Sequence, residues 1–307
     1  MATVEPAAPL PTAGPDTRYG EVFDRGYAHY DGERLGRRQA FRSLIGYSIK
    51  RAMGIRKSWT AKIIPFFLYL AAFIPVIVMI GITAIVPQAN MASYSGYFQA
   101  IFTIVGIFVA AVSPEMLCVD RQERTLPLYF ARAITRFDYV LAKVLATTIL
   151  TMTLSVLPVV ILWLGRQLVA ESPGRAMRDN IDDLGKVVLI GTLIALVLGT
   201  GGLVISSLTS RRIVAVAMIV VLFLTLTATA NIGYELVADE AEWAEYLLLI
   251  SPSDVFFALI YQLFPVDQTE SLLIDASDFS ETFLISYMVG FVVLGILFVR
   301  WRYSPKE

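Results

Sequence analysis

Cysteine and histidine are almost missing from this sequence, in which Cys118 is the only cysteine and His29 the only histidine. A single cysteine excludes an intramolecular disulfide. A single histidine in a polar N-terminal segment excludes H-E-x-x-H zinc sites and a Ser–His pair within the apolar segments. No G-x-x-x-x-G-K-[ST] phosphate loop occurs, which excludes ATP binding in that mode. We therefore expect no metal, no cofactor and no enzyme activity in this chain.

Charged residues are also scarce, at 17% of the 307 residues, against roughly 25% in soluble chains. Hydrophobic residues make up 56%, and the mean hydropathy is +0.66. The apolar residues come in long runs, which is typical of a membrane protein. The formal net charge of −1 gives no bulk attraction to nucleic acid, so no nucleic-acid partner is expected.

A helix needs about 20 apolar residues to cross a bilayer core of ~30 Å. Six segments of the chain are long enough, at residues 63–86, 97–119, 139–164, 187–208, 213–234 and 282–299. We predict an all-α membrane protein with a six-helix transmembrane domain over 63–299. The interiors of the six segments hold essentially no ionisable side chain, which disfavours a pump driven by protons or sodium.

A further apolar stretch at 243–264 is too short to span because Ser251-Pro252-Ser253-Asp254 divides it. Ser251 can cap the second piece, Pro252 suits its first turn, and Asp254 can complete a capping box. We expect a re-entrant or interfacial helical hairpin on the extracytoplasmic side, just before the last span.

The N-terminal region divides into two parts. Residues 1–35 are polar and rich in proline, and we expect them to be a mobile tail. Residues 36–57 repeat apolar side chains at helical spacing. The basic residues of this segment lie mostly on the other side, and they are Arg37, Arg38, Arg42, Lys50 and Arg51. This pattern predicts a basic amphipathic helix on an anionic membrane surface. An ordinary packed surface helix is the alternative. The apolar positions of the pattern include Phe41, Leu44, Ile45 and Ile49.

Lysine and arginine concentrate on the cytoplasmic side of membranes. With the N-terminus inside, 21 of the 25 Lys and Arg residues fall on the inner side, and only Arg166, Arg175, Arg178 and Lys186 fall outside. We therefore expect a multi-pass protein of the plasma membrane with its N-terminus and residues 300–307 in the cytoplasm.

The inside loop at 120–138 carries an apolar group that no span requires. Charged residues from Asp120 to Arg124 are expected to keep its start in water, and Thr135 with Asp138 forms a T-x-x-D cap for the third span. A short helix with an apolar tip could dock into a groove on another protein. An interfacial turn touching lipid headgroups is an equal alternative. The apolar group consists of Leu126, Leu128, Tyr129 and Phe130.

The run Asp-Arg-x-x-x-Thr-Leu-Pro-Leu-Tyr, followed by Arg and then Thr-Arg-x-Asp-Tyr-Val-Leu-x-Lys, resembles the cytoplasmic loop of type-2 ABC transporter permeases. This resemblance implies the membrane subunit of an exporter, paired with a second copy or a related permease. It also implies a separate cytoplasmic ATPase subunit that binds the ATP. Matching positions imply an ATPase-coupling element made of Glu123, Arg124, Thr125, Leu126, Leu128, Tyr129, Arg132 and Arg136.

The same resemblance implies that the helix at about 37–53 lies against the ATPase and the membrane, and that Arg211 and Arg212 form a second inside loop. The apolar spans favour amphipathic or lipid-linked cargo, although the cargo stays open. A non-transporting membrane subunit for assembly, immunity or sensing is the alternative function. Gly191, Gly199, Gly201 and Gly202 permit close helix packing, or a contribution to the subunit contact or the pathway.

Overall fold

The computed structural model describes residues 36–55, 59–85, 93–131, 134–238, 241, 243–264, 273 and 279–303. The chain divides into two units, residues 1–34 and 35–307. The tail expected at 1–35 and the last four residues, 304–307, lie outside the described residues. All that follows concerns the second unit, whose regular elements in these ranges are helices.

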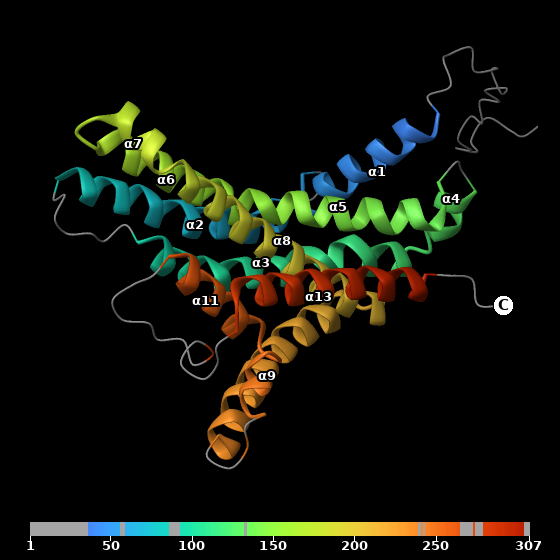
Figure 1. The fold of residues 1–307 in the computed structure, drawn as a ribbon. Helices are drawn as coiled ribbons and strands as arrows, with labels where there is room; N and C mark the ends of the chain where they lie inside the picture. Colours follow the sequence, from blue (N-terminus) through green and yellow to red (C-terminus); the bar gives the residue numbers. More distant parts are fainter. Residues whose placement is uncertain are drawn as a thin grey trace, which may run out of the picture. The chain divides into compact units, whose positions relative to one another are not determined.

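Six helical segments are long and apolar enough to cross a membrane, as predicted. They are Lys62–Ile85, Tyr94–Gln122, Arg136–Val169, Ile181–Leu208, Arg212–Val237 and Glu281–Arg302. Figure 1 shows the helices that form and connect them and labels all of the following except α10. These are α1 (Arg37–Ala52), α2 (Thr60–Ile85), α3 (Tyr94–Gln122), α4 (Leu126–Phe130), α5 (Arg136–Ser155), α6 (Leu157–Val169), α7 (Pro173–Asp179), α8 (Ile181–Leu208), α9 (Arg212–Val237), α10 (Glu245–Leu248), α11 (Pro252–Leu263) and α13 (Glu281–Arg302).

The third span, predicted as one helix, is divided into α5 and α6 at Val156. Pro158 lies in the first turn of α6, where its missing N–H cannot bond the carbonyl of Leu154. Pro65 and Pro75 stay inside α2 and Pro114 inside α3. A proline in an apolar run therefore does not by itself predict a break.

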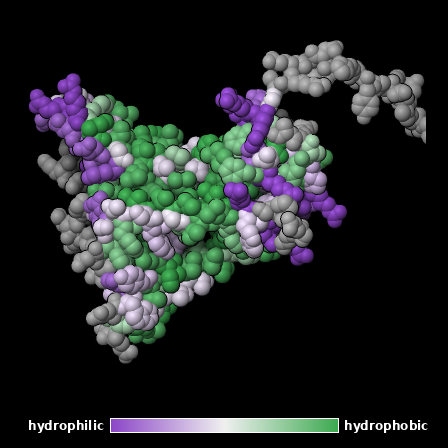
Figure 2. Space-filling view, turned by 45° about the vertical axis from the view of Figure 1, so that its right-hand side comes forward, coloured by the Kyte–Doolittle hydropathy of each residue, from purple (hydrophilic) through white to green (hydrophobic). Residues whose placement is uncertain are grey.

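Helix α3 is the centre of the bundle. In the most apolar 18-residue stretch of α3, 72% of the residues are buried, against 17% in the corresponding stretches of α2 and α9. Helices α5, α8, α9 and α11 all pack against it. Helix α9 diverges from the other spans toward its C-terminal end (Figure 1), which leaves most of its apolar surface uncovered. The polar ends and the apolar surface between them are visible in Figure 2.

The stretch at 243–264 forms the two short helices that its sequence predicted, α10 and α11. Ser251 accepts a hydrogen bond from the Asp254 amide at 3.4 Å, and Pro252 is the first residue of α11. The expected capping box is wrong in its second half, because the Asp254 carboxylate accepts from Asn231 at 2.8 Å. Phe256 of α11 lies 5.2 Å from Phe102 between ring centres, so α11 is part of the core.

Candidate functional site

Asp120 occupies the last turn of α3 and is fully buried. The expectation that it marks the start of a solvated loop is therefore wrong. The helix continues to Gln122, and α1 and α5 cover its last turn. A carboxylate without water needs cations and hydrogen-bond donors around it. In this fold they come from two other helices.

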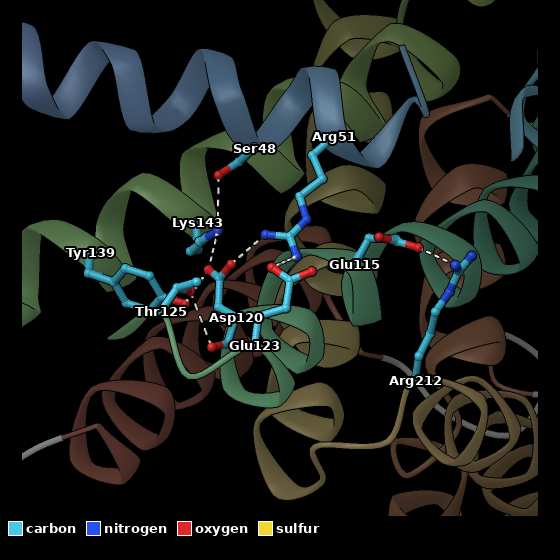
Figure 3. A network of polar contacts seen from close by, with 9 residues as sticks. All are labelled: Ser48, Arg51, Glu115, Asp120, Glu123, Thr125, Tyr139, Lys143 and Arg212. Atoms are coloured by element: carbon cyan, nitrogen blue, oxygen red, sulfur yellow. Dashed lines mark hydrogen bonds and ion pairs between the residues drawn. The ribbon is translucent and has the colours of Figure 1, made fainter. Parts of the chain in front are cut away.

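Three donors converge on the Asp120 carboxylate (Figure 3). Arg51 of α1 donates to Oδ1 at 2.6 Å. Lys143 and the Tyr139 hydroxyl, both of α5, approach Oδ2 at 2.7 Å and 2.8 Å. Lys143 also donates to Ser48 Oγ of α1 at 3.1 Å. These five residues are called the Asp120 cluster, and they join α1, α3 and α5.

The Asp120 cluster favours one arrangement of α1, α3 and α5, because separating its members would leave a buried charge unpaired. A buried ion pair adds little net stability, but a buried charge that loses its partner costs several kcal/mol. Arg51 also lies 3.1 Å from the more exposed Glu123. Burial lowers the pKa of the Arg51 guanidinium, but the attraction of Asp120 and then of Glu123 outweighs it, so the pKa is raised. Arg51 therefore stays charged and ties α1 to α3.

Helix α1 is packed along α5, as Figure 1 shows, so the alternative of a packed surface helix describes its apolar side. Leu44 is buried in the core, and Phe41, Ile45 and Ile49 are partly buried against it. Arg38 and Arg42 are exposed, in agreement with the predicted basic side. Contact of that side with a membrane surface stays a prediction.

The turn after α3 is set by backbone geometry. Arg124 has a positive φ of 53°, the left-handed conformation that usually selects glycine at a helix C-terminus. The Arg124 amide donates to the Arg121 carbonyl at 3.3 Å, and the Thr125 amide donates to the Asp120 carbonyl at 3.1 Å. This pair of bonds is a Schellman motif. Asp120, whose side chain holds the cluster, thus also accepts the backbone bond that begins the turn between α3 and α4.

Helix α4 presents a smaller apolar tip than the sequence predicted. Leu128 is 68% exposed, while Leu126, Tyr129 and Phe130 are partly buried. The rings of Tyr129 and Phe130 lie 5.7 Å and 5.9 Å from the ring of Tyr139. Burial, with a further contribution from Asp120, raises the pKa of Tyr129 to about 12. Helix α4 therefore packs against Tyr139, a residue of the Asp120 cluster.

The predicted T-x-x-D cap is confirmed. Thr135 Oγ1 accepts from the Asp138 amide at 3.2 Å, and the Asp138 carboxylate accepts from the Thr135 amide at 3.0 Å. Arg37 of α1 adds two bonds to the same carboxylate, at 2.8 Å and 2.7 Å. Of the other residues predicted to couple to an ATPase, Glu123 pairs with Arg51 and Arg136 donates to the Tyr303 carbonyl. Arg132 lies outside the described residues.

The second inside loop is tied to α3 as well. Arg212 forms an ion pair with the buried Glu115, and Arg121 donates to the Ser207 carbonyl (Figure 3 shows the former). Cys118 Sγ donates to the Ser206 carbonyl at 3.4 Å. The end of α8 and the start of α9 are thus fixed to the same helix that holds Asp120.

A cavity of about 460 Å³ lies between α3, α8 and α9, where α9 diverges. Thr103 is the single polar side chain in the described lining, and Ile107, Leu198, Ile219 and Phe223 are typical of the rest. Such a lining can hold an acyl chain or another apolar group. Among the described residues no group of His, Cys, Asp and Glu could hold a metal ion.

Comparison with known protein families identifies the chain. Residues 69–307 match the family described as ABC-2 family transporter protein. The chain belongs to the ABC-2 transporter family. This confirms the resemblance to type-2 ABC permeases. No functionally curated protein matches the chain. The ABC-2 match begins inside α2, so the attachment of α1 is a feature that the structure adds.

Two glycines of this ABC-2 protein's fourth span, Gly191 and Gly202, allow close helix packing. A Cβ on Gly202 would lie 2.5 Å from Val109 Cγ1 and from Ser113 Oγ of α3. A Cβ on Gly191 would lie 2.8 Å from Val156 Cγ2, at the α5–α6 break. Gly201 also lines the apolar cavity. Tight intramolecular packing therefore explains Gly191 and Gly202.

Sequence reasoning missed the Asp120 cluster. The sequence pattern predicts a solvated Asp120 and places Arg51 on the polar side of an amphipathic helix. The available signal is Lys143, a cation about two turns into the helix that begins the third span. A lysine at that depth indicates a buried anion nearby, but its partner is 23 residues away in the sequence and on another helix.

Proposed function

We propose that this ABC-2 protein is the permease subunit of an ATP-driven exporter, and that α4 couples it to a separate cytoplasmic ATPase. The proposal rests on the way in which α4 is attached to the helix bundle. An exposed Leu128 stands on a five-residue helix whose base is held by a Schellman turn and by ring contacts to Tyr139. A projecting apolar side chain on a rigid base suits a groove in a partner protein.

The Asp120 cluster supports a mechanical mechanism. Pressure on α4 would reach Tyr139 through its rings and the end of α3 through the turn at Arg124. Because Asp120 also holds Arg51 and Lys143, α1, α3 and α5 would move together. Such a rigid displacement changes which side of the membrane is open if the ATPase binds the two states with different affinity.

The positions of the basic residues support cytoplasmic termini in the plasma membrane. Arg37, Arg51, Arg121 and Arg212 belong to contacts with the ends of α3, α5 and α8 that adjoin α4. This enrichment at one end matches the positive-inside rule. The ATPase and the anionic lipid surface would then meet the same end of the protein.

The cavity beside α9 supports an apolar or amphipathic cargo. The weakly buried helices α2 and α9 leave room for a second copy or a related permease, which would enclose a larger pathway. ATP would be bound only by the partner subunit. The cavity lining disfavours a fully hydrophilic cargo at this position, because it offers a single hydroxyl.

The coupling assignment is tested by adding one charge to the tip of α4. Leu128→Glu should weaken binding of the purified ATPase subunit by about tenfold or more and abolish transport in proteoliposomes, because a carboxylate would be desolvated in an apolar groove. Gln122→Glu adds the same charge to an exposed position just before α4 and is the matched control.

Wild-type binding and transport by Leu128→Glu would assign the contact to another surface. Purification of the chain from native membranes without any ATPase would instead support a non-transporting subunit.

A further inference from the structure

A second cavity of about 460 Å³ opens at the base of α4, between the ends of α3, α5 and α13. Three guanidinium groups line it, those of Arg121, Arg136 and Arg302. Its apolar wall includes Leu126, Phe130 and Tyr303. These six residues are called the arginine pocket. The three cations come from three different spans.

In the ranges that the structure describes, the arginines of this pocket differ from other basic residues in having no carboxylate partner. Arg121 donates to the Ser207 carbonyl and lies 5.1 Å from the centre of the Tyr303 ring. Arg136 donates to the Tyr303 carbonyl at 3.5 Å and lies 5.3 Å from the Phe130 ring. Within the described part of the chain, no carboxylate pairs with Arg121, Arg136 or Arg302. By contrast, Arg37 and Arg51 each pair with an aspartate.

Among the described residues, two buried donors in the pocket have no hydrogen-bond partner. Arg302 Nε and the Tyr303 hydroxyl are inaccessible and make no hydrogen bond in the described structure. Burial raises the pKa of Tyr303 to about 12, so the hydroxyl keeps its proton. Buried donors are nearly always satisfied, and an unsatisfied pair beside three cations indicates a missing acceptor of negative charge. Guanidinium forks match the oxygens of phosphate particularly well.

The level of the pocket indicates a membrane lipid as the source of the phosphate. Trp301, next to Arg302, is 67% exposed, and exposed tryptophans at helix ends lie at the headgroup level. Leu294 and Leu297 continue the exposed apolar side of α13 away from Trp301. A headgroup bound by the arginines could therefore keep its acyl chains along α13.

We propose that the arginine pocket binds the phosphate of an anionic phospholipid. The phosphate bridges α3, α5 and α13 directly below α4 and supplies the acceptor that Arg302 Nε and the Tyr303 hydroxyl lack. The binding itself is independent of the proposed function. An influence of the bound lipid on coupling rests on that function, because Arg136 belongs to both the pocket and the coupling element.

The test is a titration of the purified, delipidated chain in detergent with phosphatidylglycerol, read by native mass spectrometry. Arg302→Gln should raise the dissociation constant of the first bound lipid roughly tenfold, while Arg302→Lys keeps the charge and part of the affinity. Arg175→Gln removes one charge from an exposed position of α7 and is the matched control. It should change the constant by less than about twofold, because an exposed charge contributes only screened attraction.

Equal weakening by Arg302→Gln and Arg175→Gln would overturn the proposal, because the lipid would then respond only to surface charge. Saturable binding of inorganic phosphate without preference for phosphatidylglycerol would reassign the site to a free anion. An Arg302→Gln variant that loses ATPase binding but keeps its lipid affinity would reassign it to an acidic side chain of the ATPase. Unlike the α4 test, the lipid titration requires no ATPase, so failure of one leaves the other standing.

Discussion

Replacing Asp120 by asparagine removes one negative charge from the centre of the Asp120 cluster while keeping its shape. The carboxylate accepts from Arg51 at one oxygen and from Lys143 and Tyr139 at the other. An amide has only one oxygen, so its NH₂ group must face either Arg51 or the Lys143–Tyr139 pair. In either orientation a donor faces a donor, and Lys143 loses its carboxylate partner, whereas Arg51 keeps Glu123.

The expected loss is large because the site is dry. Breaking a buried ion pair from one side costs about 3–5 kcal/mol, most of it the penalty of the uncompensated partner. Lys143 keeps its bond to Ser48, which places the estimate nearer the lower figure. The matched control is Glu123→Gln. It removes a charge from the same Arg51, but Glu123 is 54% exposed, so the expected change is at most about 1 kcal/mol.

The measurement is the free energy of unfolding in mixed micelles, from helicity against denaturant, for the purified chain. A double-mutant cycle with Lys143→Met separates the interaction energy of the Asp120–Lys143 pair from the destabilisation that each substitution causes by itself. The double variant buries no unpaired lysine and should be more stable than the sum of the single losses predicts, by about 1–3 kcal/mol. A change below about 1 kcal/mol in Asp120→Asn, or full additivity in the cycle, would refute the reasoning.

Two further substitutions test the helix packing and the coupling turn. Gly202→Ala should destabilise the chain by about 1–3 kcal/mol, because its Cβ would overlap Val109 and Ser113, whereas Gly290→Ala has open space and should be neutral or slightly stabilising in the same unfolding assay. Arg124→Gly should raise the free energy of unfolding by about 0.5–1 kcal/mol, because glycine adopts the positive φ without strain. If the Arg124 side chain contacts the ATPase, the same variant should bind the ATPase more weakly in a pull-down.

The spans and the caps were predictable because their causes are local. An apolar run of sufficient length must leave water whatever surrounds it, and the Thr135–Asp138 cap needs only residues three positions apart. The position of Asp120 was not predictable in this way. A charge after an apolar run normally marks the water boundary, and only partners 69 and 23 residues away, Arg51 and Lys143, make burial possible.

The position of the break between α5 and α6 also could not be predicted from the sequence. Four prolines stand in the first three spans at Pro65, Pro75, Pro114 and Pro158, yet only Pro158 accompanies a division. Next to it, the Gly191 carbonyl accepts a hydrogen bond from Ser155 Oγ, and Val156 packs closely against Gly191. The break is therefore stabilised by a neighbouring helix, and its position depends on packing that the sequence alone does not display.

The distribution of polar contacts makes the two ends of the bundle mechanically unequal. At the α4 end, ion pairs from α1 reach α3 and α5, and arginines fix the α8–α9 loop to α3. Toward the other end, α5 gives way to α6 at Val156, and α9 leaves the bundle. Among the described residues, the ion pairs all lie at the α4 end. If the proposed coupling holds, a displacement applied at α4 is shared by α1, α3 and α5, because breaking the Asp120 contacts would leave buried charges unpaired. We therefore expect the α4 end to move as one body and the weakly buried α9 to change position relative to it.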